Sequence, residues 1–297
     1  MRTDEASLAG TRTLDDAAYR MVANRVYDLT GMDLNQYKPN QVKRLLDSVL
    51  RRHELDSYGT LIRRLRQDPA MLRDFKGRMS INVSEFFRDP VRFQHLDEVV
   101  IPDILRRTAK PAIWSAGSSI GCEAYSVAMI LDGHGVLEKS SILGTDIDEE
   151  VISRAQGGAY WASELRNVPE EKLNGYFQTA KAGPGEAHPM PGRRGNDGEP
   201  EELYIVNAKV RRAVRYRVED LFRSEYREEF DLIVCRNVTI YFTEEAKRGL
   251  YRRLCDALKP GGYLFVGGTE IIFDAQSLGL ENAAPFFYRL SGSGASA

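Results

Sequence analysis

The sequence predicts an α/β fold in which helices cover both faces of a mostly parallel sheet, with an all-helical segment before it. Three observations support this prediction. From Ala112 onward, short apolar runs typical of buried strands alternate with helical patterns. The first apolar run leads through a glycine turn into a helix, as at the start of a nucleotide-binding βαβ unit. Before about Pro90, the apolar residues recur only at helical spacing.

The composition is that of an ordinary soluble protein. The chain has 297 residues, enough for two modest domains or one large domain, and is 42% hydrophobic and 28% charged. Its formal net charge of -2 favours neither nucleic acid nor a membrane surface as a partner. It contains no run of about 18 apolar residues and no segment typical of a signal peptide. We therefore expect a cytoplasmic protein without membrane insertion.

The three cysteines are Cys122, Cys235 and Cys255, and they lie far apart in the sequence. They form no Cys-x-x-Cys pair and no cluster with histidine. This spacing favours neither a disulfide framework nor a zinc site. We expect no bound metal.

Residues 1–11 are expected to be a flexible tail, and residues 12–90 predict a helical domain. Asp15 or Asp16 can cap the first helix, and Thr30-Gly31 can end it. Its apolar side carries Tyr19, Val22, Val26 and Leu29, and further helices are predicted around residues 42–50, 58–66 and 69–79.

The second predicted helix has a basic side. Its residues are Lys43, Arg44, Arg51 and Arg52. Asp47, Glu54 and Asp56 partly balance this charge, so one interpretation is an ordinary solvated surface. The other is a docking surface for an acidic partner, such as a negatively charged helix.

The end of the helical segment carries polar residues at even positions. If residues 81–90 are extended, Asn82, Ser84 and Arg88 point the same way and form a small polar surface. The intervening Phe86 and Phe87 are expected in the core.

The turn after the first predicted strand, around residues 116–121, contains Gly117 and Gly121. Glycine lets a backbone approach a ligand closely, so Gly117 is a candidate cofactor-binding residue. Tight packing in a βα turn explains the same glycines equally well. The pattern alone therefore does not decide between a ligand site and a structural turn.

Two acidic residues near this turn are more informative. Glu123 lies in the first turn of the predicted helix, and Asp146 ends the next predicted strand, Ser141–Asp146. An acid at the end of the second strand typically binds a ribose diol in this fold. A second acid does not suit a pyrophosphate but suits an ammonium or sulfonium group. S-adenosylmethionine (SAM) carries both a ribose and positive charges, which makes SAM the predicted cofactor.

Two later strands also end in polar residues. The strand at 214–218 leads to Glu219-Asp220-Leu221, and the strand at 230–235 leads to Arg236-Asn237. Ligands in open α/β sheets bind at the carboxyl ends of strands. Tyr241 follows closely and is either part of such a site or an aromatic residue at the core edge.

The remaining elements complete the sheet and interrupt it once. Thr243 opens a helix, residues 258–262 form a turn before a strand at 263–266, a last strand is predicted at 286–290, and residues 291–297 form a flexible end. Between residues 157 and 210 the alternation breaks, which predicts a small inserted β-subdomain. In it, Tyr176-Phe177 can pair with residues 203–206 as a hairpin. Residues 181–202, rich in Gly, Pro and charge, are expected to be a loose loop.

Together, these residues resemble the CheR-type chemotaxis receptor methyltransferase family over roughly residues 14–290. The motifs that carry the resemblance are Asn82-Val-Ser84-Glu-Phe-Phe-Arg88-Asp89, Trp114–Met129, Gly144-Thr-Asp146-Ile-Asp148 and Phe230–Phe242. The last motif is highly specific, and four motifs in the same order make a chance likeness improbable.

The resemblance implies a Rossmann-like sheet of SAM-dependent methyltransferases in residues 91–290, with substrate docking through the helical domain. It implies methylation of glutamate side chains on the cytoplasmic coiled coil of a chemoreceptor, giving methyl esters in the adaptation step of chemotaxis-like signalling. The SAM contacts that it implies are Asn82, Ser84, Arg88, Glu123, Asp146, Asp220, Leu221, Arg236 and Asn237.

The chemistry of the residues agrees with that activity. A glutamate side chain has a pKa of about 4.3 and is already a carboxylate at neutral pH, so it needs no general base to take up a methyl group. The enzyme must mainly orient the reactants and exclude water, and orientation can contribute roughly 7–11 kcal/mol. Arg88 and Tyr241, beside Asn237, are the candidate catalytic residues.

The sequence also departs from the family pattern. Ser84 stands where Thr is usual, Cys122 where a second Glu is usual, and Ala124 where Pro is usual. Ser118, Ile120 and Asp220 differ as well. The departures suggest an atypical member that serves a signalling system other than chemotaxis, or a catalytically weak SAM-binding sensor or scaffold. A third hypothesis, an enzyme for a small acid, is disfavoured by the basic helical domain. We expect a monomer that binds the receptor coiled coil and no nucleic acid.

Overall fold

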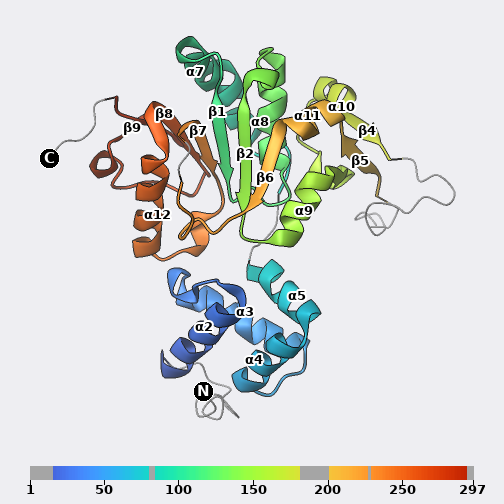
Figure 1. Ribbon diagram of the computed structural model, residues 1–297, viewed down its shortest axis with the longest axis vertical. Helices are drawn as coiled ribbons and strands as arrows, with labels where there is room; N and C mark the ends of the chain where they lie inside the picture. Colours follow the sequence, from blue (N-terminus) through green and yellow to red (C-terminus); the bar gives the residue numbers. More distant parts are fainter. Residues whose placement is uncertain (1–15, 80–83, 181–200, 227–228, 293–297) are drawn as a thin grey trace. The chain divides into compact units, whose positions relative to one another are not determined.

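The computed structural model describes residues 16–79, 84–180, 201–226 and 229–292 (Figure 1). The chain divides into two compact units, Met1–Asn82 with Thr239–Gly249, and Val83–Val238 with Leu250–Ala297. This division places the first boundary before residue 90, because Phe86 and Phe87 pack in the core of the second unit.

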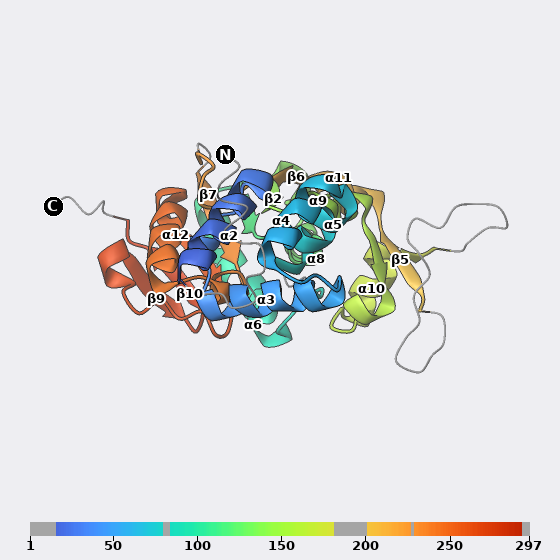
Figure 2. The ribbon, with the colours of Figure 1, turned by 90° about the horizontal axis from the view of Figure 1, so that it is seen from below.

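The first unit is helical, as expected (Figure 2). Its helices are α2 (Asp16–Thr30), α3 (Pro39–Arg52), α4 (Tyr58–Gln67) and α5 (Pro69–Met79), with a 3-10 turn η1 (Leu34–Gln36). Helix α2 ends before Gly31, whose φ of 76° is the left-handed conformation of a helix-ending glycine. The residues buried between the helices include Val22, Val26, Val42, Leu46, Val49, Leu61, Phe75 and Met79.

A short segment from the second half of the sequence also belongs to this unit. It contains the 3-10 turn η5 (Thr239–Tyr241) and the first residues of helix α12 (Glu244–Asp256). The backbone of Phe242 pairs with Tyr37, and their rings lie edge to face at 5.0 Å. The backbone N–H of Lys38 also donates to the Tyr241 carbonyl at 2.9 Å. This return of the chain was not foreseen from the sequence.

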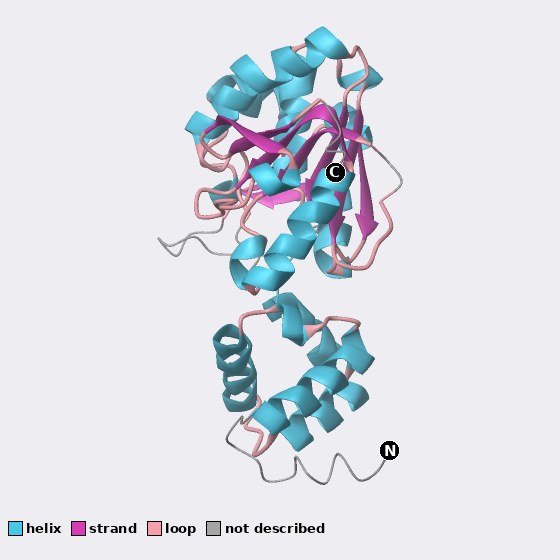
Figure 3. Cartoon of the chain, turned by 90° about the vertical axis from the view of Figure 1, so that its left-hand side faces the viewer, coloured by secondary structure: helices cyan, strands magenta, loops and turns pink. Residues whose placement is uncertain are grey.

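The second unit is built on a seven-stranded sheet between helices (Figure 3). Five strands run parallel to one another: β1 (Ala112–Ala116), β2 (Ser141–Asp146), β6 (Val214–Val218), β7 (Phe230–Cys235) and β8 (Leu258–Val266). Strand β10 (Phe287–Leu290) pairs antiparallel with β8 on one side and with β9 (Leu280–Ala284) on the other. The order is β6-β2-β1-β7-β8-β10-β9. The direction of winding reverses between β1 and β7, which is where open α/β sheets bind ligands.

Successive side chains along each strand point to opposite faces of the sheet. Ile113 and Ile142 lie in the large core cluster with the side chains of α8 (Cys122–Gly133). Trp114 lies on the other face, where its ring contacts Tyr226 at 4.5 Å. The other helical elements of this unit are α6 (Pro90–His95), a π-helical turn η2 (Leu96–Val100), α7 (Ile101–Arg107), η3 (Leu137–Lys139), α9 (Glu149–Gly157), η4 (Ala162–Glu164), α10 (Glu170–Tyr176), α11 (Ala208–Ala213) and η6 (Gln276–Leu278).

The inserted β-subdomain is a three-stranded sheet in the order β3-β5-β4. Its strands are β3 (Ala159–Trp161), β4 (Phe177–Thr179) and β5 (Leu203–Val206), and both outer strands run antiparallel to β5. The expected pairing of Phe177 with the 203–206 strand is confirmed. Most of the loop expected at 181–202 lies outside the described residues, as do the tail at 1–11 and residues 293–297.

The last part of the sheet differs from the prediction in two places. Residues 258–262 are not a turn before the strand, because β8 begins at Leu258 and a bulge with Gly261 at φ 76° lies within it. Strand β9 was not predicted, because its sequence, LENAA, carries no strand-type alternation and is held by pairing with β10.

The described residues contain no helix with the length and apolarity needed to span a membrane. The three cysteines are buried and unpaired.

Candidate functional site

The turn after β1 combines two glycines with unusual backbone angles. Gly117 has a φ of 76°, and a side chain there would come within 2.5 Å of the Cγ2 atom of Val238. Gly121 has a φ of 88°, and a side chain there would meet the Tyr216 hydroxyl at 2.5 Å. Both glycines are therefore required by packing within the protein, whatever ligand the turn receives.

Glu123 lies in the first turn of α8, directly beside this turn. Its Oε1 atom accepts a hydrogen bond from the Ser115 hydroxyl at 2.8 Å. Its Oε2 atom lies 3.8 Å from Nη1 of Arg236, beyond hydrogen-bond distance, and the side chain is 16% exposed. Burial raises the pKa of Glu123 and outweighs the opposing effects of Arg236 and Ser115. Since Oε2 accepts no hydrogen bond from the described residues, the carboxylate keeps acceptor capacity on that oxygen.

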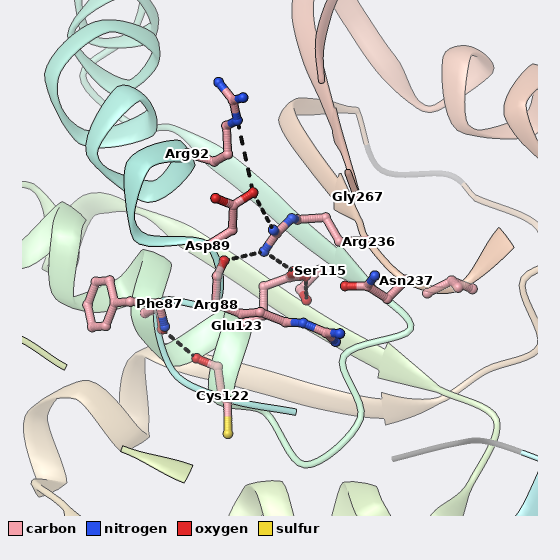
Figure 4. A network of polar contacts seen from close by, with 12 residues as sticks. Phe87, Arg88, Asp89, Arg92, Ser115, Cys122, Glu123, Arg236, Asn237 and Gly267 are labelled. Atoms are coloured by element: carbon pink, nitrogen blue, oxygen red, sulfur yellow. Dashed lines mark hydrogen bonds and ion pairs between the residues drawn. The ribbon is translucent and has the colours of Figure 1, made fainter. Parts of the chain in front are cut away.

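Arg236 connects Glu123 with the segment before α6 (Figure 4). Its side chain is 4% exposed and also lies 3.8 Å from the Asp89 carboxylate. It donates to the Arg88 carbonyl at 3.0 Å, and its guanidinium stacks over the ring of Phe265 at 4.6 Å. Burial lowers the pKa of Arg236, although Glu123 and Asp89 oppose this shift. Figure 4 shows the side chain between Asp89 on one side and Glu123 on the other.

Asp146 ends β2, as predicted, and ties the glycine turn to that strand. One carboxylate oxygen accepts from the backbone N–H of Ser119 at 2.9 Å, and the other accepts from Asp148 at 3.1 Å. Burial raises the pKa of Asp146 despite these bonds. An ionised carboxylate accepts about four hydrogen bonds, so Asp146 can still bind hydroxyl groups.

The condition for a shared polar surface, an extended segment at residues 81–90, is not met in the described part. Residues 86–89 form turns, with left-handed φ angles at Phe87 (49°) and Asp89 (67°). Both phenylalanines are buried, and the Phe87 N–H donates to the Ser126 hydroxyl on α8 at 3.0 Å. Tertiary packing of two consecutive phenylalanines thus overrides the alternating pattern.

The polar residues of this segment therefore do not share one side of a strand. Asn82 lies outside the described residues. Burial raises the pKa of the Cys122 thiol well above its usual value, and the Ser84 side chain opposes this shift. Arg88 is half-buried and contributes its carbonyl to Arg236.

Asp220 and Leu221 lie in the loop after β6. The loop is tied to β2 by a bond from the Glu219 N–H to the Asp146 carbonyl at 2.9 Å. Asp220 accepts from the Phe222 N–H at 2.8 Å. The Leu221 carbonyl accepts from the Tyr226 hydroxyl at 2.7 Å and from the side chain of Arg253 at 3.1 Å. These bonds hold the loop beside the end of β2.

Asn237 follows β7 and has a left-handed φ of 59°. Its backbone N–H donates to the carboxylate of Glu270 at 2.5 Å. Glu270 is a residue of the site that our sequence reasoning missed. It follows the carboxyl end of β8 after Gly267-Gly268-Thr269, and an acid just past a strand end was the same signal that identified Asp146.

The remaining predicted residues belong to the helical unit. Tyr241 lies in η5, and its carbonyl accepts from Lys38 as described above. The basic residues Lys43, Arg44, Arg51 and Arg52 are exposed on α3. No three His, Cys, Asp or Glu side chains of the described residues are arranged to bind a metal ion.

The residues around the turn fit SAM. Glu123 offers a carboxylate oxygen that accepts no hydrogen bond from the described residues to a cationic group, and Asp146 offers hydroxyl-binding capacity at the end of β2. Asp146 lies at the carboxyl end of β2, and Glu123 lies in the helical turn that follows β1, a strand that borders the reversal of winding where ligands bind in such sheets.

Comparison with known proteins agrees with this assignment. Residues 82–283 match the family described as CheR methyltransferase, SAM binding domain, and residues 17–80 match CheR methyltransferase, all-alpha domain. A chemotaxis protein methyltransferase of Listeria monocytogenes is 33% identical over 259 residues, which covers 87% of this chain and 91% of that protein. One of Salmonella typhimurium is 32% identical, covering 86% of this chain and 84% of that protein.

Among solved structures, a glycopeptide N-methyltransferase in complex with SAM is similar over 57% of this chain and 53% of its own, with 13% identity and a TM-score of 0.32. The two family matches together span nearly the whole described chain. The protein therefore belongs to the CheR family of SAM-dependent protein methyltransferases.

Proposed function

We propose that this enzyme methylates glutamate side chains on the cytoplasmic coiled coil of a chemoreceptor. When bound, SAM supplies a methyl group that becomes the methyl ester of the acceptor carboxylate. Because that carboxylate is already ionised at neutral pH, the protein needs to orient it rather than to remove a proton from it.

The observation that carries the substrate assignment is the basic surface of α3. Its apolar side, with Val42, Leu46 and Val49, is buried against the helical unit. Its opposite side exposes Lys43, Arg44, Arg51 and Arg52, and within the described residues none of these four forms an ion pair. A row of exposed cations on one helix suits a negatively charged helix as partner.

The residues around the glycine turn would hold the cofactor. Glu123 would bind its cationic methionyl end, and Asp146 would bind the ribose hydroxyls. Arg236, fixed between Asp89 and Glu123, would keep the Glu123 side chain in place. Arg88 and Tyr241 are proposed to orient the acceptor carboxylate, beside Asn237.

A catalytically weak SAM sensor remains the competing function. It was motivated by Cys122 and Ala124, which differ from the usual residues of the family. Both are fully buried in the core cluster along α8. Their substitution alters packing and removes no group that is exposed at the site, which favours an active enzyme.

The test is methyl transfer from radiolabelled SAM to membranes that contain a chemoreceptor from the same organism. We expect label that is released as methanol by alkali, as methyl esters are, and that is lost when the acceptor glutamates are changed to alanine. SAM binding by calorimetry, measured in parallel, separates the two functions. Normal binding without alkali-labile label would identify a sensor.

A further inference from the structure

The most buried carboxylate near the proposed cofactor site is that of Glu270, at 3% exposure. Its Oε2 atom accepts from the backbone N–H groups of Asn237 at 2.5 Å and Gly267 at 2.9 Å. Its Oε1 atom accepts from Val238 at 2.9 Å. One side chain therefore joins the segment after β7 to the segment after β8.

Each of these contacts restricts the backbone. Asn237 adopts a left-handed φ of 59°, which is uncommon for a residue other than glycine. A side chain at position 267 would overlap Oε2 of Glu270 and would lie 3.0 Å from the Asn237 nitrogen, so it would have to displace the Glu270 carboxylate. The unusual angle of Asn237 is thus held by a carboxylate that backbone atoms closely surround.

Glu270 also supports the glycine turn after β1, and it does so through Val238. Its N–H is bound by Glu270, and its Cγ2 atom would lie 2.5 Å from a side chain at Gly117. Val238 therefore packs directly on the turn that follows β1. Glu270 therefore connects the segments after β7 and β8 directly and the turn after β1 through Val238, and β1 and β7 border the reversal of winding.

Glu270 also contributes charge to the site. It acts electrostatically on both Glu123 and Arg236. Burial, and then Glu270 and Glu123, raise the pKa of the neighbouring Cys235 thiol. The negative charge of Glu270 therefore acts on Glu123, the group that would bind the cationic end of SAM.

We propose that Glu270 is a positioning residue for SAM, which acts by holding Asn237 and Val238 in the conformation that binds the cofactor. The inference rests on the proposed function and, within it, on the SAM contact at Asn237 that the resemblance to the family implies. Glu270 itself is buried and acts through these neighbours.

The test compares Glu270→Gln with Asp231→Asn. Asp231 is another buried carboxylate of the second unit, at the amino end of β7, where it accepts from the Ala112 N–H at 2.8 Å and pairs with Lys259 at 2.7 Å. Both substitutions replace a carboxylate by an amide of the same shape, and both should lower the melting temperature. In Glu270→Gln the new NH₂ group faces backbone N–H donors, which cannot bond to it.

SAM affinity is measured by calorimetry at a temperature where all variants are folded. Glu270→Gln should weaken binding by about tenfold, from at least one donor left unsatisfied, whereas Asp231→Asn should leave it unchanged. In the methylation assay, Glu270→Gln should raise the KM for SAM and leave the KM for receptor unchanged. A lower melting temperature with unaltered SAM affinity would show that Glu270 is purely structural and would overturn the proposal.

Asn237→Ala and the double variant separate this inference from the proposed function. If Glu270 acts through Asn237, the two substitutions together should weaken binding by less than the product of their single effects. Weak binding in Asn237→Ala with normal binding in Glu270→Gln would leave the site assignment intact and overturn only the role of Glu270. Normal binding in Asn237→Ala would remove Asn237 from the proposed site.

Discussion

The guanidinium of Arg236 lies 3.8 Å from the carboxylate of Glu123, close enough to attract it but too far to hydrogen-bond. Arg236 instead donates to the Arg88 carbonyl. Glu123 is therefore held by Ser115 on one oxygen, while its other oxygen stays available for a ligand cation.

This arrangement predicts a pH dependence of SAM binding. Since burial raises the pKa of Glu123 above the ordinary 4.5, the ligand-free protein protonates this group at a higher pH than an exposed glutamate does. A cation binds the carboxylate form, so affinity should fall as pH is lowered through the raised pKa, and binding there should release a proton. Calorimetry in buffers of different ionisation enthalpy measures that proton.

Glu123→Gln is the matched variant for this prediction. It should bind SAM more weakly at neutral pH and release fewer protons on the acid side. Asp146, whose pKa is also raised by burial, accounts for the remaining pH dependence. If the variant and the wild type release the same number of protons, Glu123 does not bind the cation.

Asp146→Ala should weaken SAM binding at least tenfold, because lost partners of buried hydroxyls cost about 1–3 kcal/mol each. It also removes the acceptor of the Ser119 and Asp148 N–H groups, so the glycine turn should loosen as well. Asp148→Ala is the control, since Asp148 caps α9 by accepting from Glu150 at 2.9 Å. Unchanged calorimetric affinity in Asp146→Ala would contradict the ribose assignment.

Arg44→Glu combined with Arg51→Glu should raise the KM for receptor and leave SAM affinity intact. The wild-type reaction should also slow with added salt, because exposed charges are screened beyond about 10 Å at 0.1 M. Lys139→Glu with Arg212→Glu, two exposed cations of the second unit, is the control with the same change in charge. Equal effects of the two pairs of substitutions, or kinetics that do not depend on salt, would indicate that the basic residues of α3 form an ordinary solvated surface and do not bind the receptor.

The inserted subdomain carries a prediction about receptor tethering. The resemblance to the family implies a second way of binding the receptor, because some members bind a short peptide at the C-terminus of the receptor as an added strand of this subdomain. Here residues 182–200, rich in Gly and Pro and outside the described residues, interrupt the hairpin of β4 and β5. We expect no dependence on such a peptide.

Calorimetry with C-terminal peptides of receptors from the same organism checks this prediction. Deletion of residues 182–200 should leave methyl transfer essentially unchanged. Micromolar peptide binding that competes with methylation would refute it.

Local patterns predicted much of the fold. Strand β2 has the predicted bounds of Ser141–Asp146, and β7 ends directly before Arg236-Asn237 as expected. These strands are continuous apolar runs whose identity depends little on distant residues. The helices of the first unit were likewise predicted from their apolar spacing.

The misses have a different cause. The turn at Phe87 arises from burial of its ring and from the bond of its N–H to Ser126 on α8, and Glu270 joins the site only because β7 and β8 are neighbours. Such contacts depend on the assembled sheet, and no local spacing encodes them. For Glu270, the acid just past a strand end was the one available signal.

The pairing of Tyr37 with Phe242 has a consequence for modularity. The polypeptide leaves the catalytic unit after Val238, contributes residues 239–249 to the helical unit, and re-enters at Leu250. Removal of residues 1–82 would remove two backbone hydrogen bonds of this segment, from the Lys38 N–H to the Tyr241 carbonyl and from the Thr243 N–H to the Gln36 carbonyl. It would also expose the ring of Phe242, which packs on Tyr37, to water. The helical unit is thus not a detachable fusion partner. Exchange of helical units between relatives requires that both segments be transplanted together, because residues 239–249 of the recipient would otherwise have to pack against the helices of another protein.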